Sequence, residues 1–193
     1  MNCTEEIQRY PLAEAEKVAG EIVELLRPSC ERIEIAGSIR RQKTSVKDIE
    51  IVYVPKVNFE RDLFMVFTCI ETILADKKIR SLEDQFIISR RWLSSGRGAY
   101  GRCNKLMVHC RSGIPVDLFA TTEESWFNYL VCRTGPAELN RQICLEAKRR
   151  GFGWMPYGCG FRILSDGEVF PMASEKEVFD FVDIPYQEPH LRG

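Results

Sequence analysis

The stretch Asp48-Ile49-Glu50-Ile51-Val52 alternates acidic and aliphatic residues, and it predicts a strand over residues 48–54. Successive side chains of a strand point to opposite faces, so Asp48 and Glu50 share one face while Ile49 and Ile51 enter the core. Adjacent carboxylates repel each other unless a cation lies between them, and hard oxygen ligands at this spacing suit Mg²⁺. An isolated acid-x-acid pattern is nevertheless more often a solvated strand face than a metal site, so its context decides.

The residues that precede this strand favour phosphate binding. Gly37 and Ser38 follow an apolar stretch over residues 33–36, and Arg40 and Arg41 come next. A glycine lets the backbone approach a phosphate closely, and a serine hydroxyl can donate to an oxyanion. An arginine fork matches phosphate oxygens in pairs.

A third acid lies far along the chain, in a second strand-like run over residues 114–120. Asp117 alternates there with Val116 and Leu118. If the two strands are neighbours in one sheet, three carboxylates converge and can hold two metal ions about 3.5–4 Å apart. Phosphate-binding groups beside paired carboxylates are typical of metal-assisted phosphoryl transfer, which is the chemistry we expect.

The composition is that of an ordinary globular protein. The chain has 193 residues, of which 45% are hydrophobic and 28% charged, and this excludes collagen, low-complexity disorder and coiled coils. Neither a signal peptide nor an apolar run of 18 residues is present. The eight cysteines form no C-x-x-C pair, which favours free thiols in a reducing compartment. We expect an intracellular protein without a membrane span, either cytoplasmic in a prokaryote or a virus-infected cell, or nuclear.

The net charge of −1 conceals an uneven distribution of charged residues. Residues 37–115 carry 15 basic and 8 acidic side chains, whereas residues 1–36 and 116–193 each carry four more acids than bases. The net charge alone does not favour a nucleic-acid partner, but a basic block between acidic flanks does.

The hydrophobic pattern predicts a mixed α+β fold, with a mostly antiparallel sheet flanked by helices and then a smaller lobe of helices and short strands. Helices are expected over residues 11–27, 61–76, 123–131, 136–150 and 174–182. Strands are expected over residues 33–36, 48–54, 85–93, 105–110, 114–120, 152–155 and 161–164. The two lobes are expected to comprise residues 1–122 and 123–193, because helical patterns replace strand patterns at this point.

Residues Ala36-Gly37-Ser38-Ile39-Arg40-Arg41, followed by Asp48-Ile49-Glu50 and by Asp117, resemble the nucleotidyltransferase signature of DNA polymerase family X, which includes DNA polymerase beta and bacterial PolX enzymes. The resemblance covers nearly the whole chain. It continues over residues 9–15, 134–140, 150–152, 175–179 and 186–189. It implies a polymerase palm over residues 1–122 and a nucleotide-selecting lobe over 123–193, in a minimal form without the helix-hairpin-helix region of many relatives.

The resemblance also implies residue roles and ligands. Asp48, Glu50 and Asp117 are expected to be catalytic and to bind two Mg²⁺ ions, with Mn²⁺ as a substitute. The residues expected to bind the triphosphate are Gly37, Ser38, Arg41 and Arg9. Those expected to contact the sugar and base of the nucleotide are Thr134, Gly135 and Asn140.

Five positions depart from the family pattern. Glu50 stands where an aspartate is usual, and Lys47 stands where a glycine is usual. Cys132 and Arg133 replace aromatic residues that often precede the Thr-Gly pair, which puts sugar discrimination in question. Cys144 replaces an arginine that touches the template strand in many relatives, which puts template fidelity in question.

Glycines spell G-x-G-x-x-G over residues 96–101, but the following run over 105–110 is strand-like and argues against a dinucleotide-binding turn. A glycine-rich hairpin loop is the better interpretation. Its cations Arg97 and Arg102, and Lys105 at the start of the next strand, are candidate contacts to a DNA backbone.

The function expected from these features is that of a monomeric DNA-directed DNA polymerase. It would add dNMP from dNTP to a primer 3′-hydroxyl, on primer-template or gapped DNA, in short-gap repair. One alternative is a template-independent or ribonucleotide-tolerant terminal nucleotidyltransferase. Another is an inactive DNA-binding module that keeps the fold without the chemistry.

Overall fold

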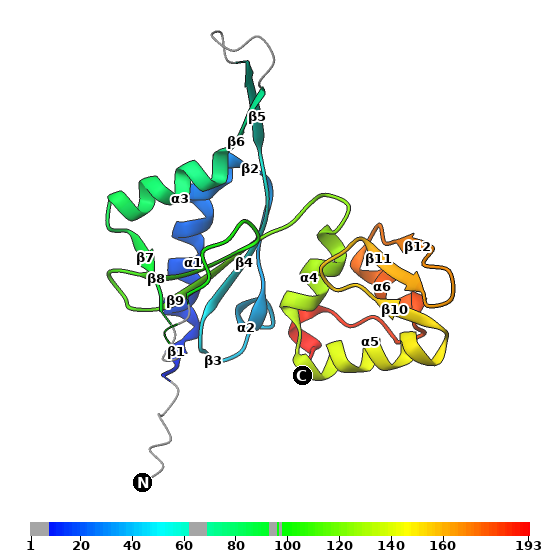
Figure 1. The fold of residues 1–193 in the computed structure, drawn as a ribbon. Helices are drawn as coiled ribbons and strands as arrows, with labels where there is room; N and C mark the ends of the chain where they lie inside the picture. The colour runs from blue at the N-terminus through cyan, green and yellow to red at the C-terminus, as the bar shows by residue number, and fades with distance from the viewer. Residues whose placement is uncertain (1–7, 62–68, 93–95, 97) are drawn as a thin grey trace.

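The computed structural model describes residues 8–61, 69–92, 96 and 98–193. Its central element is a five-stranded sheet (Figure 1). In spatial order the strands are β2 (Cys30–Ile35), β4 (Ile49–Pro55), β9 (Pro115–Ala120), β8 (Asn104–His109) and β7 (Ile88–Arg90). Of the four pairings described in this sheet, three are antiparallel and the β4–β9 pairing is parallel. The predicted α+β fold with a mostly antiparallel sheet is therefore confirmed.

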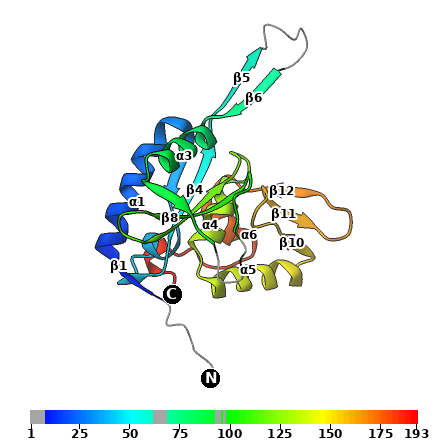
Figure 2. The ribbon, with the colours of Figure 1, turned by 60° about the vertical axis from the view of Figure 1, so that its left-hand side comes forward.

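Helices α1 (Leu12–Leu26) and α3 (Leu74–Asp84) pack on one face of this sheet (Figures 1 and 2). Helix α1 forms because its apolar residues recur every three or four positions, as predicted. Pro11 precedes it, where a missing backbone N–H costs nothing. Its buried residues are Ala15, Val18, Ala19, Ile22, Val23 and Leu26.

Two short elements lie beside the start of the chain. Strand β1 (Tyr10–Pro11) pairs with β3 (Ser45–Val46), and the hydroxyl of Tyr10 donates to the carbonyl of Gly113 at 3.0 Å. Between β2 and β3, the short helix α2 (Gly37–Arg40) follows the buried Ala36. These contacts bring the Gly37-Ser38 turn to the end of the sheet where β4 begins.

The predicted helix over residues 61–76 is wrong. Strands β5 (Val57–Arg61) and β6 (Cys69–Ile73) pair with each other in antiparallel register, and α3 begins at Leu74. This two-stranded ribbon projects from the body (Figure 1). The sequence Ile70-Glu71-Thr72-Ile73 is rich in β-branched residues that favour a strand, and short apolar runs fit helical and extended periods equally well. Part of the predicted helix, residues 62–68, lies outside the described residues.

The C-terminal part contains the predicted helices and strands within a few residues of their expected bounds. Its helices are α4 (Trp126–Thr134), α5 (Ala137–Arg149) and α6 (Glu175–Phe181). A three-stranded antiparallel sheet of β10 (Phe152–Trp154), β11 (Gly160–Ile163) and β12 (Val169–Pro171) packs against them. Gly167, in the turn between β11 and β12, has a positive φ of 84°, which a glycine adopts without strain.

The hydrophobic core is divided into three clusters. One joins α1 and α3 to the sheet, and a second lies within the C-terminal helices and strands. The third packs Trp126, Tyr129 and Leu130 of α4 against Val52 of β4 and Phe119 of β9, on the other face of the sheet. Helix α4 therefore belongs to the interface between the two parts, and the boundary at residues 122 and 123 stays a prediction. None of the described helices has the length and apolarity needed to cross a membrane.

Helix α6 begins with a capping box formed by Ser174 and Glu177. The backbone N–H of Glu177 donates to Ser174 Oγ at 3.1 Å, and Glu177 Oε2 accepts from the N–H of Ala173 at 2.8 Å. We expect Ser174→Ala to lower the free energy of unfolding by about 1 kcal/mol, because a helix N–H loses its acceptor. Ser165→Ala, at an exposed turn serine, is the control and should change stability by less than about 0.5 kcal/mol in urea unfolding. Equal effects of the two variants would contradict a capping role.

Candidate active site

The parallel register of β4 and β9 places Glu50 directly beside Asp117. Residues at alternate positions, Ile49 and Ile51, are fully buried against α1 and α3, so the two carboxylates lie on the opposite face. Asp48 precedes β4 by one residue. The two strands are thus neighbours, which is the condition for the three acids to converge, and the face that carries Glu50 and Asp117 is the face on which α4 packs.

Gly37 lies against the side chain of Glu50. Its φ is +63°, and a Cβ atom at this position would clash with Glu50 Oε2 and lie 3.2 Å from Glu50 Cβ. A residue with a side chain would therefore meet both backbone strain and a steric conflict. The absence of a side chain at Gly37 therefore lets the turn after β2 pack closely against the side chain of Glu50.

The three carboxylates influence one another electrostatically. Burial and then the neighbouring charge of Asp48 raise the pKa of Glu50 to about 7, with a smaller contribution from Asp117, while Arg133 and Arg41 act in the opposite direction. Burial also raises the pKa of Asp117, and its ion pair with Arg91 counteracts this. The site concentrates negative charge in a partly desolvated place, which favours the binding of a cation.

Asp117 already has a cationic partner. Arg91 Nη2 lies 2.5 Å from Asp117 Oδ1, and the side chains of the two residues are 23% and 14% exposed. Arg91 was not predicted as a site residue. Its position directly after β7 (Ile88–Arg90) gave no signal, because only the pairing of β7, β8 and β9 brings it to the acid.

Arg133 is a second cation that the residue pattern did not assign to the acids. Its guanidinium lies 3.6 Å from the ring centroid of Phe119, 5.1 Å from that of Tyr157 and 5.6 Å from that of Tyr129. Its charge lowers the pKa of both Glu50 and Asp117. Three aromatic rings from β9, α4 and the segment after β10 therefore hold this cation beside the acidic site.

The triphosphate candidates occupy different surroundings. Arg41 Nη1 donates to the carbonyl of Thr134, and the charge of Glu50 counteracts the lowering of the Arg41 pKa by burial, so Arg41 joins the acids to the predicted nucleotide turn. Ser38 is partly exposed beside Gly37. Arg9 is exposed, and its Nη1 donates to the Ser45 carbonyl at 3.4 Å. Their phosphate-binding roles stay predictions.

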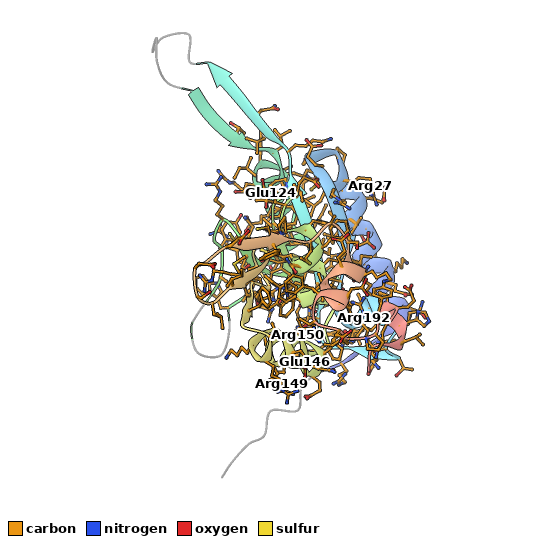
Figure 3. The ribbon with its side chains drawn as sticks, turned by 90° about the vertical axis from the view of Figure 1, so that its right-hand side faces the viewer. Arg27, Glu124, Glu146, Arg149, Arg150 and Arg192 are labelled. Carbon is orange, nitrogen blue, oxygen red and sulfur yellow. The ribbon has the colours of Figure 1, made fainter. Side chains whose placement is uncertain are left out.

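Arg40 and Arg192 share one carboxylate across the two parts of the chain. Arg40 contacts both oxygens of Glu175, at 2.5 and 3.1 Å, and donates to Thr134 Oγ1 at 2.9 Å. The buried Arg192, labelled in Figure 3, donates from Nη2 to Glu175 at 2.9 Å and from Nε to the carbonyl of Gln187 at 2.8 Å. This network fixes the C-terminal part against α2.

The predicted sugar and base contacts lie at the junction of α4 and α5. Thr134 is fully buried, and Gly135, at φ +64°, leaves space for Arg41 Nη1, which lies 3.2 Å from the position of a Cβ atom. Asn140 Nδ2 donates to the carbonyl of Cys132 at 2.8 Å. The amide keeps a buried acceptor, Asn140 Oδ1, without a hydrogen-bond partner among the described residues, and contact with a nucleotide stays a prediction.

The candidate DNA contacts are dissimilar. Arg97 lies outside the described residues, and Arg102 is exposed. Lys105 is buried, with Nζ 2.8 Å from Asp76 Oδ1 and 3.0 Å from the carbonyl of Gly101, so its charge is already compensated within the chain. Strand β8 contains Lys105, as the strand prediction for residues 105–110 required.

The last turn of α5 carries further basic residues. Figure 3 labels Arg149, at the end of α5, and Arg150, which follows it. Arg149 pairs with Glu146 at 2.5 Å, and Arg150 pairs with Asp183 at 3.1 Å. These ion pairs and the favourable position at a helix C-terminus account for both charges without a nucleic acid.

The donor set fits a hard divalent cation, because it consists of carboxylate oxygens that repel one another without one. Within the ranges that the structure describes, no three histidine, cysteine or acidic side chains are gathered closely enough to hold a metal ion. Asp117 is engaged by Arg91 instead. Metal binding by Asp48, Glu50 and Asp117 is therefore a proposal that requires a local rearrangement of side chains.

Gly37→Ala tests the close contact between the turn and Glu50. We expect it to destabilise the protein by more than Gly167→Ala, which shares the positive φ but has no atom within 4 Å of the added Cβ. The control should lose about 1 kcal/mol from backbone strain, and Gly37→Ala about 1–2 kcal/mol more from the displaced side chain. Urea unfolding measures both. Indistinguishable losses would show that Glu50 accommodates the methyl group freely.

Glu50→Gln tests the raised pKa in metal-free protein. The pKa is about 7 in the folded state against 4.5 for the free side chain, so stability from this group is present below pH 4.5 and is lost as the pH rises through 7. We expect the variant to match the wild type near pH 4.5 and to exceed its free energy of unfolding by about 3 kcal/mol at pH 8.

The measurement is urea unfolding in EDTA across this pH range. Glu16→Gln, at an exposed position of α1, serves as the control and should show a difference from wild type that does not vary with pH. A pH-independent difference for Glu50→Gln as well would contradict a desolvated carboxyl.

Comparison with known proteins adds one assignment. The family model of the DNA polymerase beta thumb matches residues 129–193, which is about a third of the chain. No curated protein matches the chain. Residues 129–193 are therefore a region similar to that of family X polymerases, and the similarity suggests a DNA-binding part of a polymerase-type protein.

Proposed function

We propose that this chain is a nucleotidyltransferase that adds nucleotides to a DNA 3′ end, in the manner of a small family X polymerase. The observation that carries the proposal is the pairing of Glu50 with Asp117 on adjacent parallel strands. These acids lie beside the Gly37-Ser38 turn and are linked through Arg41 to the thumb-like region. A carboxylate cluster between a phosphate-binding turn and a DNA-binding region is suited to phosphoryl transfer.

In the proposed reaction, Asp48, Glu50 and Asp117 hold two divalent cations. Bound ions of this kind supply charge neutralisation and Lewis-acid activation of a hydroxyl. Arg41 is placed to bind phosphate oxygens of the nucleotide, since its guanidinium lies at the junction of the acids and Thr134. Ser38 would donate its hydroxyl to the same group. Asn140 would contact the base, and its buried Oδ1 has no other hydrogen-bond partner among the described residues.

The residues before Thr134 favour a second candidate, an enzyme that tolerates ribonucleotides or needs no template. Cys132 is partly buried in the C-terminal core, and Arg133 is occupied by three aromatic rings beside the acids. Cys144 likewise packs against the core and offers no charge to a template strand. Positions 132 and 133 therefore carry no aromatic pair that could discriminate between the sugars of dNTP and rNTP.

The decisive experiment is primer extension on gapped, recessed and single-stranded DNA, with dNTP or rNTP and with Mg²⁺ or Mn²⁺. We expect extension to be fastest on gapped DNA with dNTP. Asp117→Asn and Asp48→Asn should each lower the rate by at least about 10³-fold, because each removes a carboxylate from the proposed metal site. Asp84→Asn, at an exposed position at the end of α3, is the matched control and should leave the rate unchanged.

Other outcomes select the alternatives. Equal rates on single-stranded and gapped primers, or equal use of dNTP and rNTP, would identify the second candidate. No product with any primer, nucleotide or metal would leave a DNA-binding module without chemistry. Folded Asp48 and Asp117 variants with normal rates would refute the assignment of the acids.

A further inference from the structure

The ion pair of Arg91 with Asp117 places a cation on one of the three carboxylates proposed to bind metal. Arg91 lies directly after β7, where its backbone N–H donates to the carbonyl of Leu106 at 2.9 Å. Its Nη2 lies 2.5 Å from Asp117 Oδ1, and both side chains are largely shielded from solvent. Its Nε is buried and has no hydrogen-bond partner among the described residues. Asp117 is thus the main partner that holds this guanidinium in place.

We propose that Arg91 is a positioning residue that occupies the third carboxylate until a divalent cation displaces it. The inference rests on the proposed function, because it assumes that Asp117 is a metal ligand. It explains why the acids influence one another electrostatically while no three ligand groups are gathered in the described part of the chain. Asp117 is directed to a guanidinium rather than to a point shared with Asp48 and Glu50.

Charge and geometry both indicate that Arg91 and a divalent cation cannot bind Asp117 Oδ1 at the same time. A guanidinium in hydrogen-bond contact with Asp117 Oδ1 occupies a lone pair that a metal ion would use, and its positive charge repels the ion. A divalent cation shared with Asp48 and Glu50 would neutralise more of the negative charge than Arg91 does. Arg91 therefore weakens metal binding. In the metal-free protein, its positive charge offsets part of the repulsion among the three carboxylates.

Arg90, the last residue of β7, provides a matched control. It is the same residue type at the adjacent position, but it pairs with Glu83 at 2.9 Å and stacks on Tyr100 at 3.7 Å. Its side chain is 51% exposed. Removal of its charge alters the surface near α3 without touching Asp117.

The test is Mn²⁺ binding, measured as free Mn²⁺ by electron paramagnetic resonance, with protein folding confirmed by circular dichroism. We expect Arg91→Gln to bind Mn²⁺ about tenfold more tightly than wild type, because it removes a competing charge at contact distance. Arg91→Lys should fall between the two, and Arg90→Gln should stay within about twofold of wild type. Unchanged or weaker binding by folded Arg91→Gln would overturn the inference.

A double-mutant cycle separates competition at Asp117 from a general structural effect. In an Asp117→Asn background, Arg91→Gln should change Mn²⁺ affinity by no more than about twofold, since the shared ligand is gone. The same tenfold gain in both backgrounds would show that Arg91 does not act through Asp117. Failure of the proposed function has another signature, in which neither wild type nor Arg91→Gln binds Mn²⁺.

Tryptophan fluorescence can test the displacement while Arg91 and Asp117 are both intact. Trp92 adjoins Arg91 and is 70% exposed, whereas Trp126 and Trp154 are buried. Displacement of Arg91 should change the fluorescence of Trp92, so saturating Mg²⁺ should alter the emission of wild type but not of Trp92→Phe. Identical responses of the two proteins would contradict the displacement.

Discussion

The parallel pairing of β4 with β9 is the constraint on which the rest of the site depends. It aligns Glu50 with Asp117 and sends Ile49, Ile51, Val116 and Leu118 to the opposite face, where α1 and α3 bury them. Burial of these aliphatic side chains removes apolar surface from water and supplies much of the stability of the sheet. The same alternation leaves two carboxylates side by side on the face toward α4. The alternation of side chains along β4 and β9 thus both positions the acids and buries the aliphatic residues that stabilise the two strands.

Cations balance this concentration of acids in two ways. Arg91 and Arg133 lie close to the carboxylates, one through an ion pair and the other from a cluster of aromatic rings. Farther away, Arg40 and Arg192 share Glu175 and hold the C-terminal part against α2. Because Arg40 also binds Thr134, and Arg41 binds the carbonyl of the same residue, two adjacent arginines connect the turn near the acids to the end of α4.

Much of the fold follows from local patterns. Helices α1 and α5 are predictable from a proline at the start and from apolar spacing or a glycine at the end, and α6 from its capping box. The ribbon of β5 and β6 is not, since an apolar run of that length fits both a helix and a strand, and only pairing across the ribbon decides. The acids and the Gly37-Ser38 turn carry their own signal in residue type and spacing. Arg91 carries none, because an isolated arginine after a strand is typical of a protein surface.

The sequence by itself determined which residues could perform chemistry and where helices α1, α5 and α6 form, since residue type and periodicity are local properties of the chain. Tertiary structure alone decided how those residues meet. The register between β4 and β9, separated by some sixty residues, depends on packing of two faces at once, and so does the arrival of Arg91 at Asp117. The aromatic surroundings of Arg133 arise in the same way, from β9, α4 and the segment after β10. Long-range electrostatic partners are set by the folded sheet, and no spacing along the chain encodes them.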